Sequence, residues 1–591
     1  MNILGISCYY HDAAAALLQD GMLVAAAEEE RFTRKKHDSA FPTHAIWFCL
    51  EQAEIDPGDL DYVVFYEKPL VKFERILTTA LGTFPRSAEM FTEAMIAQFN
   101  NKLWIRSLLA SHLGITAEKI LFVDHHMAHA ASAFFCSPFK EAALLTVDGV
   151  GEWTTAATGS ATADWNGQGT NAIRLSREIR FPHSLGLLYS TFTAFLGFEV
   201  NEGEYKVMGM AAYGEPRYLA KVYQLIRVAS DGSFHLNMDY FSFHESVTRS
   251  FSSRFLDLFG APRDPITEFI SSDVLPDLSG REAVAKTSQY YADVAASIQK
   301  VTEDILLKMA NHLQRETGLK TLCMAGGVAL NSVANGRIFR ETAFEDLFIQ
   351  PAAGDSGGAV GAALHAWHVL LGKPRKYVME HAYLGQESDE EEIRGFLNQN
   401  NIPYKVEKDE DLLSQMVDVL AAAKVVGWFQ GRFEWGPRAL GHRSILADPR
   451  RGEMKQIVNS KIKFREAFRP FAPMLPEKYA GKYFEGLPGA SVPFPCRFMQ
   501  LVLPWRDNAA NLVPAVNHVG TGRLQTVRPD WNPRCHRLLQ LFEEATGVPI
   551  LMNTSFNLRG EPIVASVANA WDTFKNSGLD VLVLGNCVIR K

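Results

Sequence analysis

Long apolar runs, CxxC cysteine pairs and low-complexity tracts are all missing from this chain. No uninterrupted apolar stretch reaches membrane-spanning length, so we expect no transmembrane helix. The seven cysteines are scattered, which indicates neither a zinc ribbon nor a disulfide framework and suits a reducing compartment. The N-terminus lacks the basic stretch of a signal peptide, and His11 and Asp12 interrupt the apolar residues. We therefore expect a cytoplasmic protein without a membrane partner.

Basic residues are also fewer than acidic residues. The 591 residues include 59 Lys and Arg against 67 Asp and Glu, and the formal net charge is −8. This balance argues against attraction of the whole surface to nucleic acid or to an anionic membrane. A hydrophobic content of 47% and a charged content of 21% are those of an ordinary globular protein. A chain of this length predicts about two to four domains.

Two similar strand-and-loop units occur in the first part of the chain. A predicted strand at 3–9 leads to a loop with His11 and Asp12, and then to a hairpin at 13–27 that turns at Asp20-Gly21. A second strand at 143–147 leads to a loop at 148–151 and a β-like stretch at 153–161. This duplicated plan is that of the actin-like ATPase fold. The polar residues 372–376 indicate a linker after it.

A histidine pair in the run 122–133 is the most informative local feature. A predicted strand precedes it and an Ala-rich helix follows, so His125 and His129 lie on one side of that helix. Imidazoles so placed bind iron, zinc or manganese when carboxylates complete the site, and Asp148 and Asp355 are the candidates. The plain alternatives are an incidental pair at a helix N-terminus and, for Asp355, the N-cap of a helix at 359–371.

A glycine turn and a basic segment are two further candidate sites. Gly326-Gly327 joins a predicted strand at 320–325 to a helix entry at Asn331, where a backbone can approach an anionic ligand, although such a turn also serves loop geometry alone. Residues 432–469 hold ten Lys and Arg and four Asp and Glu, a local net charge of +6. Interleaved aromatic, Pro and Gly residues favour a structured phosphate or carboxylate site. A salt-bridged surface and a nucleic-acid surface are the alternatives.

Six ordered motifs, spread over nearly the whole chain, match one family. They are residues 11–17, 27–37, 201–209, 435–441, 468–473 and 553–562. In these motifs the chain resembles the NodU-type O-carbamoyltransferases, which carbamoylate hydroxyls on antibiotics and nodulation factors. The resemblance implies an α/β protein with two domains. Residues 1–372 would form an actin-like domain similar to the tRNA threonylcarbamoyl transferase, and residues 383–591 a YrdC-like α/β domain.

The resemblance also implies the reaction and its cofactors. Carbamoyl phosphate and ATP would give carbamoyl-adenylate and pyrophosphate in the second domain. The carbamoyl group would then pass to a hydroxyl of a small-molecule acceptor, a secondary metabolite as in antibiotic biosynthesis, in the first domain. One divalent metal is implied there, with Fe²⁺ favoured by the family and Mn²⁺ or Zn²⁺ suited to the same ligands. Mg²⁺ would accompany ATP.

The resemblance assigns roles position by position. The metal ligands are His125, His129, Asp148 and Asp355, with His126 excluded. Adenylate binding falls on Lys206, Gly326, Gly327 and Asn331. Binding of carbamoyl phosphate and ATP falls on Arg438, Lys463, Arg469, Arg523 and Arg559. His11, as a neutral catalytic base, and Asp239 are associated with the acceptor hydroxyl, although His11 could also only brace its loop.

One motif departs from the family pattern. Family members often read Thr-Ala-Arg-Pro-Gln-Thr-Val where this chain has Thr-Gly-Arg-Leu-Gln-Thr-Val at 521–527. Arg523 is present in both patterns, but the changed neighbours predict a different local backbone conformation. We expect residues 239–281, the part least like any motif, to line the acceptor pocket.

Three other functions fit parts of the sequence. A small-molecule kinase on the actin-like fold explains the first domain and leaves the basic second domain without a role. A tRNA-modifying carbamoyl or threonylcarbamoyl transferase would use the basic segment as an RNA surface, with salt-sensitive binding. A non-catalytic ligand-binding regulator predicts no turnover.

Overall fold

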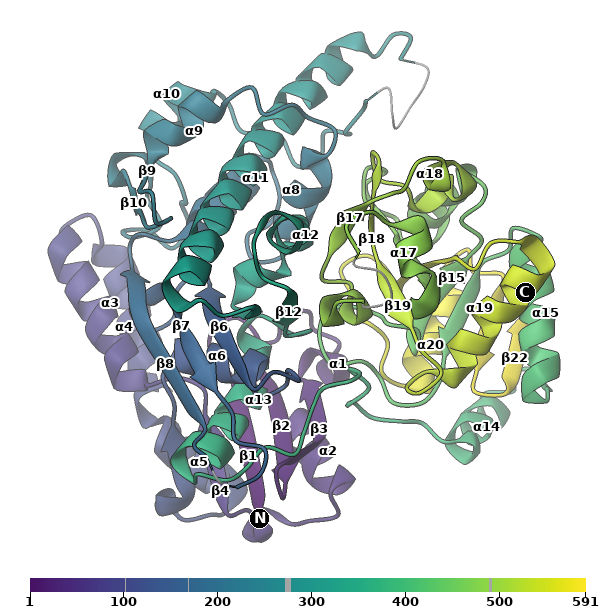
Figure 1. Ribbon diagram of the computed structural model, residues 1–591, viewed down its shortest axis with the longest axis horizontal. Helices are drawn as coiled ribbons and strands as arrows, with labels where there is room; N and C mark the ends of the chain where they lie inside the picture. The colour runs from purple at the N-terminus through teal and green to yellow at the C-terminus, as the bar shows by residue number, and fades with distance from the viewer. Residues whose placement is uncertain (101, 168, 272–277, 488–491) are drawn as a thin grey trace. The chain divides into compact units, whose positions relative to one another are not determined.

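The computed structural model describes residues 1–100, 102–167, 169–271, 278–487 and 492–591 (Figure 1). Residues 272–277 of the expected acceptor region lie outside the described residues. The chain forms two compact units. Unit 1 comprises Met1–Ala25 and Ser39–Val378, and unit 2 comprises Ala26–Asp38 and Met379–Lys591. The short segment 26–38, which the expected boundaries assign to the first domain, thus folds with unit 2.

The first sheet of unit 1 has the strand order β3-β2-β1-β4-β5. Strand β1 (Asn2–Ser7) pairs antiparallel with β2 (Ala14–Gln19) and parallel with β4 (Tyr62–Phe65), which pairs parallel with β5 (Ile120–Phe122). The predicted turn at Asp20-Gly21 separates β2 from β3 (Met22–Glu28). A hairpin therefore extends one side of β1, and two parallel strands extend the other.

The second sheet of unit 1 repeats this plan, with the order β12-β11-β6-β7-β8. Strand β6 (Glu141–Val147) pairs antiparallel with β7 (Thr154–Thr162) and parallel with β11 (Thr321–Ala325). The outer strands are β8 (Ala172–Arg180) and β12 (Asp346–Ile349). The internal duplication predicted from the two strand-and-loop units is confirmed in the strand order of both sheets.

Helices α6 (His125–Phe134) and α13 (Asp355–His365) pack against each other and carry the predicted metal ligands. The helix expected at 359–371 begins four residues earlier, at Asp355, and continues as a π-helix at Ala366–Leu370. The longest helix, α11 (Glu282–Thr317), has α8 (Glu204–Ala211) and α12 (Ser332–Glu341) beside it (Figure 1). The other α-helices of unit 1 are α2 (Thr43–Gln52), α3 (Pro69–Thr83), α4 (Ala88–Asn100), α5 (Ile105–Leu113), α7 (Leu185–Phe195), α9 (Leu219–Leu225) and α10 (Ser253–Phe259).

Unit 2 is built on a mixed eight-stranded sheet, β13-β22-β21-β14-β15-β20-β16-β19. The pairs β14 with β21 and β16 with β19 are parallel, and the other pairs are antiparallel. The strands are β13 (Lys405–Val406), β14 (Val426–Phe429), β15 (Arg443–Ala447), β16 (Ala472–Pro476), β19 (Gln525–Val527), β20 (Leu551–Ser555), β21 (Val581–Leu584) and β22 (Cys587–Arg590). A separate ribbon joins β17 (Val502–Pro504) to β18 (Thr521–Arg523).

Helices α15 (Asp409–Ala421) and α19 (Pro533–Thr546) supply apolar faces to the core of unit 2. Leu412, Met416 and Phe542 are buried there with Trp428 and Met474 of the sheet. The other helices are α1 (Glu30–Thr33), α14 (Glu390–Gln399), α16 (Glu453–Ile457), α17 (Ala480–Tyr483), α18 (Ala509–Leu512) and α20 (Val567–Lys575).

Two expectations about what the chain lacks concern the fold. All seven cysteines lie in the described part of the chain, where each is buried and none forms a disulfide bond. Over the same described residues, no helix combines the length and the apolar character that crossing a bilayer requires.

Candidate metal centre and basic cluster

Helix α6 presents its two predicted histidine ligands to one point. The strand β5 ends at Phe122 and the helix begins at His125, so the histidines occupy the first and second turns on one face. The Nε2 atoms of His125 and His129 lie 3.0 Å apart, and both side chains are buried. The prediction that they converge is confirmed.

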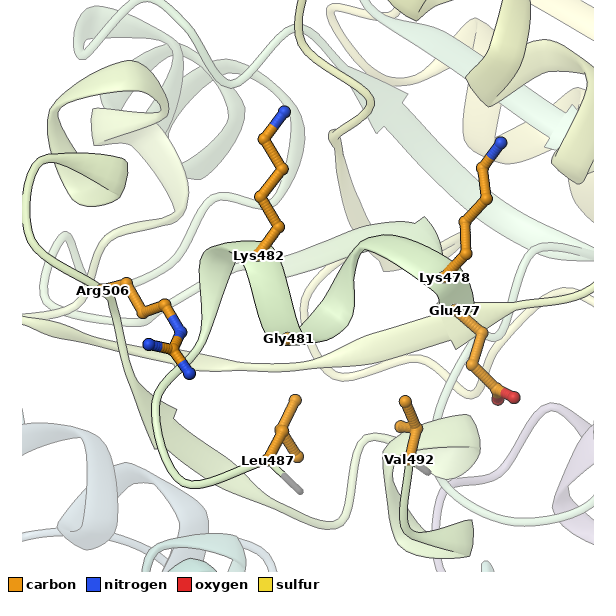
Figure 2. Close-up of a pocket in the computed structure, with 7 residues that line it drawn as sticks. All are labelled: Glu477, Lys478, Gly481, Lys482, Leu487, Val492 and Arg506. Atoms are coloured by element: carbon orange, nitrogen blue, oxygen red, sulfur yellow. The ribbon is translucent and has the colours of Figure 1, made fainter. Parts of the chain in front are cut away.

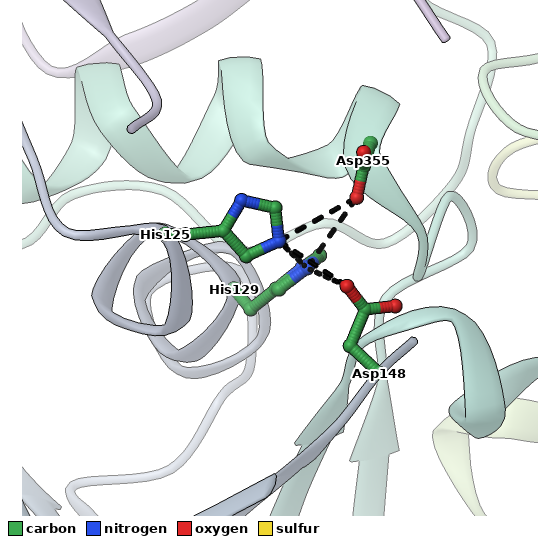
Figure 3. Close-up of side chains that lie close together, drawn as sticks. All are labelled: His125, His129, Asp148 and Asp355. Carbon is green, nitrogen blue, oxygen red and sulfur yellow. Dashed lines mark hydrogen bonds and ion pairs between the residues drawn. The ribbon is translucent and has the colours of Figure 1, made fainter. Parts of the chain in front are cut away.

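Two carboxylates close the site from other elements (Figure 3). Asp148 follows the end of β6, and its Oδ2 lies 3.2 Å from Nε2 of His125 and 3.7 Å from Nε2 of His129. Asp355 opens α13, and its Oδ1 lies 3.5 Å and 3.8 Å from the same two nitrogens. The N-cap interpretation of Asp355 is wrong, because Gly354 holds that position and no side chain caps the helix.

Small residues let α13 approach close enough for Asp355 to take part. A Cβ atom added at Gly361 would lie 1.8 Å from the carbonyl oxygen of Ala128 on α6, and one at Gly5 would lie 1.9 Å from the carbonyl oxygen of Ala359. Any larger side chain at these positions would therefore push α13 away from α6 and from β1. The glycine-rich run at 354–361 thus sets the depth at which the carboxylate enters the site.

The four residues fit one divalent cation. Their ligand atoms all lie within 4.8 Å of one another. Ligand atoms held about 2.1 Å from a common ion are separated by about 3 to 3.5 Å, close to the distances seen here. Oδ2 of Asp355 is buried without a hydrogen-bond partner, so protein groups alone leave this carboxylate incompletely satisfied. Imidazole and carboxylate together suit iron, zinc or manganese.

The charges of the site also favour a cation. Burial lowers the pKa of His125, but the hydrogen bond and charges of Asp148 and Asp355 outweigh it and raise that pKa to about 9. Burial raises the pKa of Asp355. For Asp148, burial raises the pKa, and the hydrogen bonds to His125 and His129 hold it well below its ordinary value. Asp148 and Asp355 therefore favour positive charge on His125, which a metal ion would replace.

His126 is directed elsewhere, as its exclusion from the ligand set predicts. Its Nε2 donates to the carbonyl of Thr154 at 2.9 Å, and its Nδ1 lies 2.8 Å from the hydroxyl of Thr146. Because a carbonyl only accepts, Nε2 carries the proton and Nδ1 accepts from the hydroxyl. Burial, followed by the charges of His125 and His129, lowers the pKa of His126 to about 3, so this ring stays neutral.

Two further carboxylates surround His125, and the sequence did not single them out. Oε2 of Glu67 lies 3.9 Å from Nδ1 of His125. Glu67 also pairs with Lys72 at 2.7 Å, and both side chains are only 3% exposed. Glu152 accepts the backbone N–H groups of His125 and Lys68, at 3.1 Å and 2.7 Å. These groups form an outer layer that orients the ligand.

The glycine turn is bonded directly to the metal centre. Oδ1 of Asp148, the oxygen that does not face the histidines, accepts the backbone N–H of Gly327 at 2.9 Å. Gly326 has φ of +94°, and a Cβ there would lie 2.3 Å from the carbonyl oxygen of Val147, so only glycine fits. The turn therefore holds Asp148, one of the four predicted metal ligands.

Lys206 and Asn331, the other two residues predicted for adenylate binding, have local partners. Lys206 lies in the first turn of α8, with its ammonium 5.7 Å from the centre of the Phe198 ring. Oδ1 of Asn331 caps α12 by accepting the N–H of Ala334, and its side chain forms two hydrogen bonds with Gln299. Asn331 thus has a structural role at the entrance of the helix.

His11 and Asp239 are not members of the four-residue cluster, although the charge of Asp355 acts on His11. Nδ1 of His11 lies 2.8 Å from Oδ2 of Asp12 and Nε2 lies 3.2 Å from the carbonyl of Asn201, so both nitrogens face acceptors and both carry protons. Burial lowers the pKa of His11, but the hydrogen bond and charge of Asp12 outweigh it and raise that pKa to about 9. The expected neutral imidazole is therefore not the form this arrangement favours. Asp239 is 61% exposed and pairs with Arg254.

Unit 2 gathers the predicted phosphate-binding residues. We define the basic cluster as Arg438, Lys463, Arg465, Arg469, Arg523 and Arg559. Burial, followed by the charges of Arg438, Arg465 and Arg469, lowers the pKa of Arg523 well below its usual range. Arg469 and Arg559 both approach Glu466, at 3.6 Å and 3.8 Å. Arg523 ends strand β18 and so reaches the cluster despite the altered motif.

Lys463 lies at the buried end of the cluster. Its ammonium donates to the carbonyls of Ser555 and Asn557 at 2.7 Å and 2.9 Å, and it also contacts the side-chain oxygens of both residues. All these acceptors are neutral. Burial, followed by the charges of Arg465, Arg469 and Lys36, lowers the pKa of Lys463 well below its usual value. A bound anion would favour the charged form of Lys463.

Two of the four acidic residues in segment 432–469 make their contacts away from the basic cluster, whereas Glu466 pairs with Arg469 and Arg559. Glu434 accepts three backbone N–H groups, those of Leu440, His442 and Arg443. Asp448 pairs with Arg450 at 2.7 Å, outside the cluster. The ion pairs of the basic cluster thus have Glu466 as a shared acidic partner, and arginine donors of this kind suit phosphate or carboxylate oxygens.

Sequence reasoning missed three partners of this cluster. Arg465 was counted only as one base of the segment, and Ser555 and Asn557 only as part of a motif. The signal that could have found them is the repeated alternation of polar residues in Lys463-Phe-Arg465 and Ser555-Phe-Asn557.

A separate hollow of about 360 Å³ lies beside α17 (Figure 2). Lys478, Lys482, Arg506 and Leu487 are among the residues that line it. Figure 2 shows the two lysine side chains pointing away from Leu487. None of the predicted site residues lines this hollow, so its size alone does not mark it as functional.

Known proteins provide an independent comparison. A family model described as the carbamoyltransferase N-terminus matches residues 2–364, and one described as the carbamoyltransferase C-terminus matches residues 417–591. An uncharacterized protein of Synechocystis sp. is 47% identical over 100% of this chain and 97% of its own length. Nodulation protein NolNO of Sinorhizobium fredii is 36% identical over 99% of this chain and 79% of its own length. Nodulation protein NolO of Bradyrhizobium diazoefficiens is 36% identical over 79% of each chain. The chain therefore belongs to the carbamoyltransferase family.

Proposed function

We propose that this chain is an ATP-dependent O-carbamoyltransferase that works in two steps, one in each unit. In this proposal unit 1 is an actin-like domain and unit 2 a YrdC-like domain. The duplicated sheet order of unit 1 supports the first assignment. The basic cluster of unit 2 supports the second. The acceptor is a hydroxylated small molecule.

In unit 2 the basic cluster would bind carbamoyl phosphate and ATP. Hydrolysis of carbamoyl phosphate gives carbamate and phosphate. A carbamate oxygen then attacks the α-phosphorus of ATP, forming carbamoyl-adenylate and breaking the bond to pyrophosphate. The arginines offer paired donors to phosphate oxygens, and Lys463 supplies a point charge. Fixed cations stabilise the charge that grows on the leaving pyrophosphate, and Mg²⁺ with ATP would share that task.

In unit 1 the acceptor hydroxyl would attack the carbamoyl carbon, and AMP would leave with the electrons of the broken C–O bond. A divalent ion held by His125, His129, Asp148 and Asp355 would supply Lewis-acid polarisation, with Fe²⁺ favoured by the family resemblance. The glycine turn would place backbone N–H groups near the adenylate. His11 would accept the hydroxyl proton after losing its own proton from Nε2.

The observation that carries the proposal is the separation of two charged sites in a carbamoyltransferase. A buried anionic cluster suits a metal in one unit, and a cationic cluster suits phosphates in the other. A kinase on the same fold would need only the first site. It would release ADP, whereas this reaction releases pyrophosphate and then AMP. A tRNA-modifying enzyme would need RNA as the acceptor.

Mass spectrometry of a reaction with carbamoyl phosphate, ATP and a panel of hydroxylated metabolites tests the proposal. We expect one acceptor to gain a single carbamoyl group, with pyrophosphate and AMP formed in equal amounts. Formation of ADP in place of pyrophosphate would contradict it. A parallel reaction with total tRNA as the acceptor tests the alternative that the enzyme modifies tRNA.

A further inference from the structure

The segment 26–38 belongs to unit 2, although it is distant from the rest of that unit in sequence. Its residues Glu28 and Arg31 hold both backbone groups of Gly436. The N–H of Gly436 donates to Oε1 of Glu28 at 2.8 Å, and its carbonyl accepts from Nη2 of Arg31 at 2.5 Å. Gly436 has φ of +98°, a conformation that glycine adopts readily. It stands two residues before Arg438 of the basic cluster.

Arg34, in the same segment, holds a second stretch of backbone, at Pro562 and Ile563. Its Nη1 donates to the carbonyl of Ile563 at 2.7 Å, and its Nη2 donates to the carbonyl of Pro562 at 2.8 Å. Nη2 also lies 3.8 Å from Oε2 of Glu561. One guanidinium therefore fixes the end of the loop that follows β20.

That loop positions the partners of Lys463. Nδ2 of Asn557 donates to the carbonyl of Glu561 at 2.6 Å, and the N–H of Val564 donates to the carbonyl of Phe556 at 2.9 Å. The hydroxyl of Ser555 donates to Oδ1 of Asn557 at 2.8 Å. A short chain of hydrogen bonds thus runs from Arg34, through the loop, to the oxygens that surround Lys463.

The backbone of Arg34 shows that this position is tightly specified. Its φ of +59° lies in the left-handed region, which arginine seldom adopts. Such conformations persist where surrounding contacts determine them, and they gather at binding sites. Here the left-handed residue ends α1, with its N–H bonded to the carbonyl of Glu30, and turns the guanidinium onto the loop.

We propose that Arg34 is a positioning residue for phosphate binding by unit 2. It fixes the loop at 555–563 and thereby sets Asn557 and Lys463 for the carbamoyl phosphate and ATP phosphates, without touching either ligand. This inference rests on the proposed function. It assigns to a segment early in the chain a part in the chemistry of the C-terminal unit.

The variants Arg34→Met and Lys35→Met test the inference in the full chain. Each variant removes one positive charge, and the two positions are neighbours in segment 26–38. Lys35 is a matched control because its side chain is 74% exposed and its paired acid is Asp38 at 3.8 Å. Arg34→Gly keeps a residue suited to the left-handed backbone, and Arg34→Lys keeps a charge that reaches fewer carbonyls. Exchange of labelled pyrophosphate into ATP, dependent on carbamoyl phosphate, gives kcat and KM for each protein.

For Arg34→Met and Arg34→Gly we expect kcat/KM for carbamoyl phosphate to fall on the order of tenfold or more, mainly because KM rises. The melting temperature and the metal content of unit 1 should stay unchanged. Arg34→Lys should recover part of this loss, and Lys35→Met should match wild type. Equal constants in Arg34→Met and Lys35→Met would overturn the inference, as would a loss that tracks melting temperature alone. Absence of exchange in wild type would instead refute the proposed function.

Discussion

Replacing Glu67 by Gln should weaken metal binding and, separately, destabilise unit 1. Glu67 lies 3.9 Å from Nδ1 of His125 and 2.7 Å from the ammonium of Lys72. Loss of a carboxylate behind a metal-bound histidine typically costs about 10- to 100-fold in metal affinity. The separation of 3.9 Å exceeds hydrogen-bond length, so we expect the lower end, about tenfold or about 1.4 kcal/mol.

The loss of stability has a different cause. Glu67 and Lys72 are both 3% exposed, and the Gln side chain would leave the ammonium buried without its counter-charge. Breaking a buried ion pair from one side costs about 3–5 kcal/mol. The Tyr10 ring, whose centre lies 4.0 Å from the ammonium, would offset part of this. The double variant Glu67→Gln, Lys72→Met should regain most of the unfolding free energy and keep the weaker metal binding.

Chelator competition with Mn²⁺ measures the affinity, and urea unfolding of the metal-free protein measures the stability. Glu74→Gln replaces an exposed carboxylate on α3, the helix that carries Lys72, and is the control; it should change neither quantity. Wild-type metal affinity in the double variant would refute the reasoning, because Glu67 would then act on stability alone.

Three other outcomes follow from the two sites. His129→Ala should abolish metal binding and carbamoyl transfer while pyrophosphate exchange continues, as metal analysis and the exchange assay would show. Arg469→Ala should block exchange and Lys463→Ala should weaken it strongly, because a bound phosphate would lose its partner; normal exchange in both would reduce them to surface charge. Because the pKa of His11 is raised to about 9, its base form grows as pH rises, so single-turnover transfer should increase with pH up to about 9. Asp12→Asn should move that rise to lower pH, and a profile unaffected by this change would exclude His11 as the base.

Local patterns predicted much of unit 1. Two apolar runs on either side of the Asp20-Gly21 turn predict the first hairpin, and the two strand-and-loop units predict the repeated sheet order. The sequence predicts a helix that starts at 359 with Asp355 as a possible cap, whereas α13 starts at Asp355. Its carboxylate instead turns toward His125 and His129, and glycine at 354 takes the cap position. Packing against α6 decided this, and packing does not appear in local sequence.

Some residues of the candidate site can be predicted from the sequence, and others only from the folded chain. HxxxH spacing placed two ligands on one helix face, and residue matching supplied Asp148 and Asp355. Glu67 carries no local signature, because it acts on His125 only after the strand β4 and the helix α6 come together. Arg34 lies more than 500 residues before the carbonyls that it holds, separations of 528 and 529 positions. Only the folded chain shows such contacts.

Pyrophosphate exchange is the most direct test of the central claim that unit 2 makes carbamoyl-adenylate. Purified protein would be incubated with ATP, Mg²⁺ and labelled pyrophosphate, with and without carbamoyl phosphate. We predict that label enters ATP only when carbamoyl phosphate is present, and that Arg469→Ala abolishes this exchange. Turnover of ATP to ADP with no label in ATP would contradict the account.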